Sequence, residues 1–165
     1  MAKQLFLIRH AKSDWANADL RDFDRPLNNR GRANAGEMAE RMRNLQTKPD
    51  VVVSSPAVRA FTTAQYFAKT WGINENEIET DANIYEASVK TLLNVVNHFN
   101  DKHDTIAVFG HNPGFTDFAN YLSNGHIDNM PTCSVVLLTF PFDQWGLISS
   151  NTAGILLFDY PKLKT

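Results

Sequence analysis

The stretch Leu5-Phe6-Leu7-Ile8-Arg9-His10-Ala11-Lys12-Ser13 decides how the rest of the chain is interpreted. Its unbroken apolar run is typical of a strand that is buried on both faces. The run ends abruptly in Arg9 and His10, two residues that a buried strand cannot hold without partners. In open α/β sheets, ligands bind at the carboxyl ends of the strands, where loops and helix N-termini converge. We therefore expect the chemistry of the protein at the end of this strand.

Length and composition are those of an ordinary globular protein. The 165 residues favour one domain over 1–165, with a core that needs neither disulfides nor a structural metal. A net charge of −2 gives no reason to expect nucleic-acid or membrane binding, and no apolar segment is long enough to span a bilayer. Cys133 lacks a zinc-site spacing and a Cys-x5-Arg phosphate loop, so we expect a packed thiol. Because the sequence shows no targeting segment, the expected location is cytoplasmic.

Strands and helices alternate along the chain. Apolar runs and β-forming residues predict strands at 51–53, 78–80, 105–109, 134–140 and 155–160. Apolar residues at helical spacing predict helices at 30–46, 56–71, 88–99 and 115–122. The polar segment 14–29 is expected to be a loop over the end of the first strand. The predicted fold is a three-layer α/β/α sandwich with a mostly parallel sheet, in which at least one of the last strands is antiparallel.

Phosphate-compatible residues follow three of these strands. Arg9 and His10 end the first, Arg59 lies one turn into the helix after the second, and His111 follows the third. The ends of parallel strands lie side by side, and helical side chains lean toward the helix N-terminus, so Arg59 is expected to point back to the same edge. Each residue alone is commonly structural. Two histidines and two arginines around one small volume, however, predict an anion site.

Each residue type has a physical role at such a site. The planar donor fork of arginine matches phosphate oxygens, and the guanidinium stays charged at any working pH. His10 is expected to remain neutral near pH 7 because the arginines disfavour its protonated form, and a neutral imidazole is a good nucleophile toward phosphorus. Its second ring nitrogen then needs an acceptor, for which we expect a backbone carbonyl of the following loop. His111 is expected to be a protonated donor to a phosphate oxygen, because the bound anion favours its positive charge.

Three residues of the polar loop have two possible interpretations. Lys12 and Arg25 are candidates for substrate binding, and an ordinary surface position is equally compatible with the sequence. Trp15 either lines a substrate entrance or simply packs. Nothing in the sequence decides between these alternatives.

Taken together, the motifs resemble the histidine phosphatase superfamily, the phosphoglycerate-mutase-like group. They are Arg9-His10, Ser54-Ser55-Pro56 with Arg59, and Gly110-His111-Asn112-Pro113-Gly114. The usual Arg-His-Gly reads Arg9-His10-Ala11 here. This departure, the Lys12-Ser13 that follows, Asp24-Arg25-Pro26-Leu27 with Arg30-Gly31, and the short length are most similar to the SixA-type phosphohistidine phosphatase branch. The resemblance implies a phosphoglycerate-mutase-like fold, a phosphohistidine intermediate on His10, a core completed by Arg9, Arg59 and His111, and no metal or organic cofactor.

The proton donor for the leaving group has several candidates. In larger relatives an acidic residue after the middle of the chain donates this proton, and Glu86 lies at the corresponding place in this sequence. Asp14, Asp22 and Asp24 of the first loop are rivals. Imidazole leaving from phosphohistidine is far less basic than an alkoxide, so such a substrate depends less on this acid.

The leading hypothesis is a metal-independent phosphatase that acts through a phosphohistidine on His10, with phosphohistidine in a protein as the expected substrate. The short chain lacks the long insertions that would roof the pocket, which favours a phosphoryl group displayed on a protein. The alternatives are a small-molecule phosphomonoesterase or a mutase of the same superfamily. A non-catalytic module that only binds phosphate is a further alternative.

Overall fold

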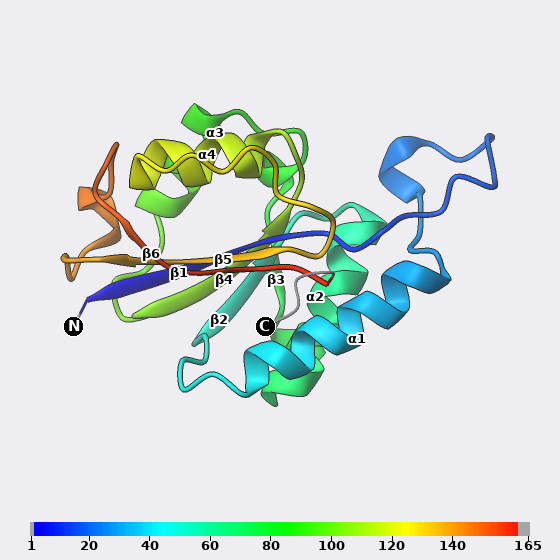
Figure 1. The fold of residues 1–165 in the computed structure, drawn as a ribbon, viewed down its shortest axis with the longest axis horizontal. Coiled ribbons are helices and arrows are strands. Elements are labelled where there is room, and N and C mark those ends of the chain that lie inside the picture. Colours follow the sequence, from blue (N-terminus) through cyan, green and yellow to red (C-terminus); the bar gives the residue numbers. More distant parts are fainter. Residues whose placement is uncertain (1, 162–165) are drawn as a thin grey trace.

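The computed structural model describes residues 2–161 and contains one six-stranded sheet (Figure 1). The strands are β1 (Lys3–Arg9), β2 (Val51–Ser54), β3 (Glu79–Thr80), β4 (Thr105–Gly110), β5 (Val135–Phe140) and β6 (Gly154–Asp159). Their order across the sheet is β3-β2-β4-β1-β5-β6. The pairs β1–β4, β2–β4 and β2–β3 are parallel, and β5 is antiparallel to both β1 and β6. The predicted mostly parallel sheet with an antiparallel strand near its end is confirmed.

Helices cover both faces of the sheet (Figure 1). They are α1 (Asn29–Arg43) and α2 (Val58–Trp71) on one face and α3 (Val89–Asn97) and α4 (Gly114–Ser123) on the other. Phe6 and Ile8 of β1 pack with α1 and α2, whereas Leu5 and Leu7 pack with α3 and α4. Alternate residues of a strand point to opposite faces, so the continuous apolar run of β1 fills two cores at once. The predicted three-layer α/β/α sandwich is confirmed.

The ends of three parallel strands lie next to one another because of the strand register. Arg9 pairs with Gly110 across β1 and β4, and Ser54 pairs with Phe109 across β2 and β4. The ladders extend slightly past the strands, since the His10 amide donates to the Gly110 carbonyl at 3.0 Å and the Ser55 amide donates to the Phe109 carbonyl at 2.9 Å. The residues that follow β1, β2 and β4 therefore leave the sheet at one edge, as the sequence predicts.

Two local expectations differ from the structure. The helix expected from Pro56 begins at Val58 with Ala57 as its N-cap, because Ser55 hydrogen-bonds inside the preceding turn: its Oγ accepts from the Ala57 amide at 3.2 Å. The loop expected over 14–29 contains a short 3-10 helix, η1 (Asp22–Asp24). Three further 3-10 helices are η2 (Glu75–Glu77), η3 (Ala82–Ile84) and η4 (Trp145–Leu147).

Two broader expectations stay predictions. One domain over residues 1–165 includes residues 1 and 162–165, which lie outside the described part of the chain. The cytoplasmic location is likewise untested. Within residues 2–161, every helix is too short or too polar to cross a membrane.

Two glycines of α1 provide a matched test of how tightly this helix packs against the chain that leaves β1. A Cβ on Gly31 would lie 2.1 Å from the Lys12 carbonyl oxygen, whereas a Cβ on Gly36 would have no atom within 4 Å. We expect Gly31→Ala to lower the free energy of unfolding by about 2 kcal/mol, because backbone must move. Gly36→Ala is expected to raise it by about 0.5–1 kcal/mol through helix propensity. Urea unfolding of both variants checks this, and equal effects would contradict it.

Candidate active site

His10 follows β1 and is buried with its ring fixed by the backbone. Its Nδ1 lies 2.7 Å from the carbonyl oxygen of Ala11. A carbonyl can only accept, so Nδ1 carries the ring proton and Nε2 is unprotonated in the neutral imidazole. The predicted backbone acceptor in the following loop is thus confirmed. Nε2 accepts from Nε of Arg59 at 3.3 Å and is the nitrogen available for attack.

Burial and positive neighbours keep His10 neutral. The pKa of His10 is lowered to about 4, chiefly by burial and further by the charges of Arg59, Arg9 and Arg25, while the bond to the Ala11 carbonyl opposes the shift. The imidazole is therefore neutral at pH 7, as the sequence predicts. Burial contributes more to this than the arginines that the prediction invoked.

Arg59 reaches back from the first turn of α2 to the end of the sheet, in the direction that the helix geometry predicts. It is buried, and all three of its nitrogens donate. Nε donates to His10, Nη1 donates to the Asp22 carbonyl at 2.5 Å, and Nη2 donates to Asp22 Oδ2 at 2.9 Å. One guanidinium thus joins the imidazole of His10 to the η1 turn.

Arg9 and His111 are the other two of the four residues that the sequence analysis predicts at this edge of the sheet. Nη1 of Arg9 donates to the Met130 carbonyl at 2.8 Å, and its buried Nε has no partner among residues 2–161. The pKa of Arg9 is lowered by burial and then by Arg59. The rings of His10 and His111 lie 5.3 Å apart between centroids. Four residues from three strand ends therefore lie close enough for their charges to influence one another.

The protonated state that we expect of His111 with an anion bound stays a prediction, and in the protein alone the ring is neutral. The pKa of His111 is lowered to about 3, first by burial and then by His10 and Arg59. Its Nε2 lies 2.8 Å from Ser55 Oγ, and its buried Nδ1 has no partner within residues 2–161. The sequence could not reveal how completely the fold removes this ring from water. A neutral His111 still offers one N–H donor.

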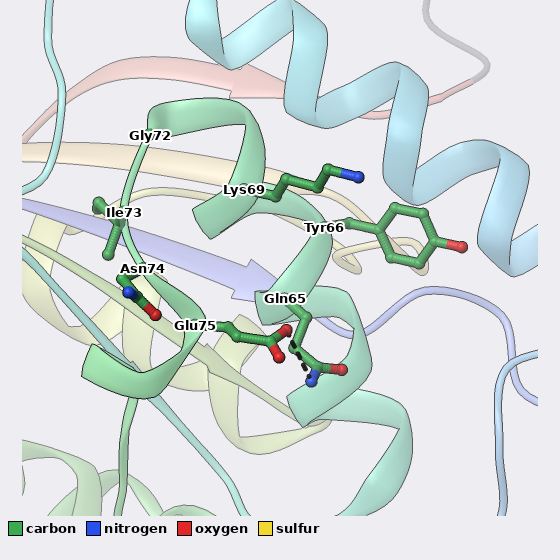
Figure 2. A pocket seen from close by; sticks show the side chains of 7 residues that line it. All are labelled: Gln65, Tyr66, Lys69, Gly72, Ile73, Asn74 and Glu75. Carbon is green, nitrogen blue, oxygen red and sulfur yellow. Dashed lines mark hydrogen bonds between the residues drawn. The ribbon is translucent and has the colours of Figure 1, made fainter.

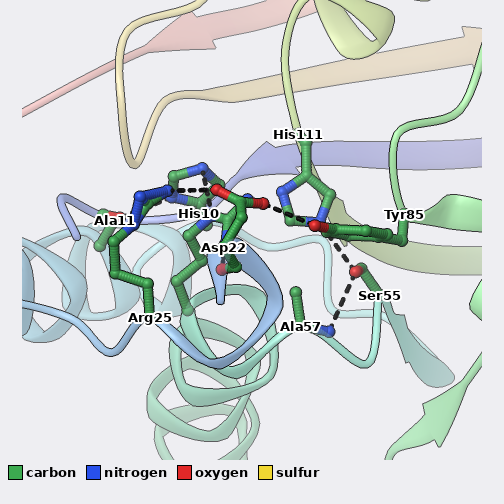
Figure 3. A network of polar contacts seen from close by, with 9 residues as sticks. His10, Ala11, Asp22, Arg25, Ser55, Ala57, Tyr85 and His111 are labelled. Carbon is green, nitrogen blue, oxygen red and sulfur yellow. Dashed lines mark hydrogen bonds and ion pairs between the residues drawn. The ribbon is translucent and has the colours of Figure 1, made fainter. Parts of the chain in front are cut away.

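Asp22 is the acceptor at the centre of the polar network (Figure 3). Its Oδ2 accepts from Arg59 Nη2 at 2.9 Å and from the Tyr85 hydroxyl at 2.6 Å, and its Oδ1 accepts from Arg25 Nη2 at 2.8 Å. Burial by itself would raise the pKa of Asp22, but hydrogen bonds from Tyr85 and Arg59 and the charges of both arginines hold it below its ordinary value. Asp22 is therefore an ionised carboxylate at neutral pH.

Comparison with known proteins agrees with this geometry. Residues 5–94, more than half of the chain, match the model of the histidine phosphatase superfamily, branch 1. The chain belongs to this superfamily. An uncharacterized chloroplastic protein of Arabidopsis thaliana is 30% identical over 153 residues, covering 88% of this chain and 70% of that protein.

Solved structures of SixA proteins share the fold. A protein assigned as the phosphohistidine phosphatase SixA of Agrobacterium tumefaciens superimposes with a TM-score of 0.81 at 25% identity, covering 98% of this chain and 99% of that one. The protein histidine phosphatase SixA complexed with tungstate gives a TM-score of 0.80 at 19% identity, covering 96% and 97% of the two chains. The predicted phosphoglycerate-mutase-like fold and the resemblance to the SixA-type branch are confirmed.

The two candidate substrate-binding residues of this superfamily member lie in different surroundings. Arg25 is buried in the cluster, and its guanidinium stacks on the indole of Trp15 at 3.5 Å from the ring centroid. Its Nε and Nη1 are buried without partners among residues 2–161. Lys12 is exposed and lines a separate pocket of about 160 Å³ with Arg30 and Asn34. Arg25 thus joins the cationic cluster, whereas Lys12 lies outside it.

The acidic candidates also separate. Glu86 is exposed and adopts a φ of 54°. Its carboxylate helps to raise the pKa of the neighbouring Tyr85 phenol. Asp14 accepts from the Ala16 amide, and Asp24 pairs with the exposed Arg21 at 2.9 Å. Of the three rivals in the first loop, Asp22 is the one bound to the cluster. The assignment of Glu86 as proton donor stays a prediction.

Tyr85 is a site residue that the sequence analysis missed. Besides its bond to Asp22, its ring meets those of His111 and Phe23 edge to face at 5.4 and 5.3 Å. Burial, Asp22 and Glu86 raise the pKa of Tyr85 to about 12, so the phenol keeps its proton. Its position next to Glu86 was the signal that could have indicated it.

A second hollow lies away from this cluster. The pocket in Figure 2 has a volume of about 740 Å³ and is lined by α2 and the turn after it, including Gln65, Lys69 and Glu75. Two of its polar side chains bond to each other, with Gln65 Nε2 donating to Glu75 Oε2 at 3.4 Å. Among the described residues, no group of three His, Cys, Asp or Glu is placed to hold a metal ion.

The environment of His10 predicts an unusual titration. Because its pKa is lowered to about 4, the ring should stay neutral as the pH falls through 6.5 and gain its proton only near pH 4. Ring nitrogen chemical shifts, assigned with a His10→Gln variant, should show the proton on Nδ1 throughout the neutral range. A midpoint near 6.5, or a proton on Nε2, would contradict the geometry.

Proposed function

We propose that the protein is a phosphatase that hydrolyses phosphohistidine in proteins through a covalent phosphohistidine on His10. Membership of the superfamily indicates a phosphatase, so the proposal concerns the residues and the substrate. The observation that carries it is the geometry of His10. Its unprotonated Nε2 faces the guanidinium of Arg59, while Nδ1 is fixed on the Ala11 carbonyl.

In the first step, the hydrogen bond from Arg59 Nε to His10 Nε2 breaks and the freed lone pair attacks the phosphorus. The bond from phosphorus to the leaving nitrogen breaks in line, and its electron pair stays on that nitrogen. The ring of His10 becomes positively charged, and its Nδ1–H bond to the Ala11 carbonyl, 2.7 Å long, stabilises that charge. Arg59 and Arg9 hold the phosphoryl oxygens, whose negative charge offsets the repulsion between the two guanidinium groups. His111, as a neutral donor, contributes one further hydrogen bond.

In the second step, water attacks the phosphorus from the side that the leaving group has left. The bond from phosphorus to His10 Nε2 breaks, its electron pair returns to the ring, and dihydrogen phosphate leaves with the oxygen and both protons of the attacking water. Arg9 and Arg59 hold the same oxygens through both displacements. The nucleophile is thereby regenerated in its neutral form.

A phosphoryl group on a protein suits the surroundings of the site. Trp15 is 75% exposed, and the Asp22 side chain is 46% exposed, so the cluster opens to solvent through the first loop. SixA proteins, named as phosphohistidine phosphatases, share the fold over nearly the whole chain. The tungstate complex of one of them is a second support, because tungstate is a tetrahedral oxyanion like phosphate.

The test compares release of inorganic phosphate from a phosphohistidine protein, p-nitrophenyl phosphate and a sugar phosphate. We expect the phosphohistidine protein to be the best substrate, and His10→Ala to reduce kcat by about a thousandfold or more because the nucleophile is lost. His126→Ala, which changes an exposed histidine, is the matched control and should retain activity. An acid-labile, alkali-stable phosphoryl label on wild type, absent from His10→Ala, should report the intermediate.

Three results would overturn parts of this proposal. Equal rates for wild type and His10→Ala would remove the covalent mechanism. Preference for the sugar phosphate would make the protein a small-molecule phosphatase or a mutase. Tight binding without phosphate release would make it a binding module.

A further inference from the structure

We propose that the Asp22 carboxylate occupies the place that the substrate's phosphoryl group takes, and that the Tyr85 hydroxyl, which holds Asp22, is a further ligand of that group. Asp22 is then an internal competitor that must leave before the phosphoryl group can bind. This inference rests on the proposed function and adds two residues to its binding site.

The first support is the number of donors that converge on one carboxylate. Arg59, Arg25 and Tyr85 come from α2, the loop after η1 and the turn after η3, and each donates to a carboxylate oxygen of Asp22 at 2.6–2.9 Å. Two arginines and a hydroxyl form a set of donors that suits a phosphoryl group as well as a carboxylate. Figure 3 shows this network beside the rings of His10 and His111.

The second support is that Asp22 shares its arginine with the nucleophile. Nη2 of Arg59 donates to Asp22 Oδ2, while Nε of the same guanidinium lies 3.3 Å from His10 Nε2. A phosphoryl group in line with Nε2 must use the outer nitrogens of Arg59, and these are the atoms that Asp22 engages. Substrate and Asp22 therefore cannot both hold Arg59 in this way.

The third support is that Asp22 is able to leave. The η1 turn contains no buried residue, and it is closed by two backbone bonds, from the Asp24 amide to the Arg21 carbonyl and from the Arg25 amide to the Asp22 carbonyl. The Asp22 side chain is nearly half exposed. Its departure uncovers no apolar core, so the cost is that of its polar contacts, which the incoming anion replaces.

Tyr85 stays in place when Asp22 leaves. Its ring packs edge to face on His111, which lies outside the η1 turn, and its hydroxyl remains protonated because its pKa is raised to about 12. A protonated phenol adds a donor without adding another positive charge to a cluster that already contains three arginines. The hydroxyl released by Asp22 then donates to a phosphoryl oxygen.

Binding of inorganic tungstate, measured by calorimetry, tests the competition without requiring turnover. Asp22→Asn removes the charge at constant size and is expected to lower the dissociation constant about tenfold, the scale of one charge-assisted hydrogen bond. Asp24→Asn removes the same charge two residues away, where Asp24 pairs with the exposed Arg21, and should change the constant less than about twofold. Asp22→Ala should tighten binding in the same direction.

The role of Tyr85 is tested in the Asp22→Asn background. There Tyr85→Phe should weaken tungstate binding about fivefold, because only the donor to the anion is lost. In wild type, Tyr85→Phe also removes a hydrogen bond that holds the competing Asp22. The loss of tungstate affinity should therefore be clearly smaller in wild type than in the Asp22→Asn background. An equal loss in both backgrounds would show that Tyr85 acts independently of Asp22 and would overturn the shared-donor model.

The outcomes separate this inference from the proposed function. Weaker or unchanged tungstate binding in Asp22→Asn, while wild type still hydrolyses the phosphohistidine protein, would overturn the inference alone. Tighter binding without any hydrolysis by wild type would support the inference and overturn the proposed phosphatase activity. Circular dichroism and thermal unfolding of each variant show that both comparisons are made on folded protein.

Discussion

Three guanidinium groups lie close to two neutral imidazoles at one end of the sheet, and the repulsion among the guanidinium charges determines which groups can lie beside them. Burial and Arg59 lower the pKa of both Arg9 and Arg25, and they also lower the pKa of His10 and His111. Buried cations need acceptors at close range. The structure supplies carbonyl oxygens and one carboxylate, so the cluster is held in a state that favours the entry of negative charge.

The acceptors around the cluster lie on two parts of the chain that differ in rigidity: the backbone next to His10 and the turn that carries Asp22. The amide of Cys133 donates to the carbonyls of Arg9 and His10 at 3.1 and 3.0 Å, and the Ala11 amide donates to Thr63 Oγ1 at 3.0 Å. The backbone on both sides of His10 is thus fixed by β1, α2 and the chain before β5. Asp22, in contrast, lies on a short exposed turn with few backbone bonds. The proposed nucleophile is fixed by strands and a helix, whereas the carboxylate that accepts from Arg59 lies on a loop.

The sequence predicts the fixed part of the site well and the loop part poorly. The run Leu5–Ile8, the apolar strands and the residues after them suffice to place Arg9, His10, Arg59 and His111 at one edge, because strand order and handedness leave few alternatives. The contact between Tyr85 and Asp22 joins residues 63 positions apart through two irregular turns. No periodicity or capping pattern encodes such a contact. The neutral state of His111 was missed for a related reason, since burial depends on the whole tertiary structure.

The charge states of the loop residues bear on the kind of leaving group that the site can serve. Asp22 is the carboxylate nearest the cluster, and its lowered pKa leaves it without a proton at neutral pH. Tyr85, with a pKa raised to about 12, gives up its proton reluctantly. Neither residue is therefore an effective acid for a strongly basic alkoxide. The imidazole of phosphohistidine leaves as a neutral ring when its other nitrogen carries a proton, so the proposed substrate needs no proton from Asp22 or Tyr85, whereas the alkoxide of a sugar phosphate needs one.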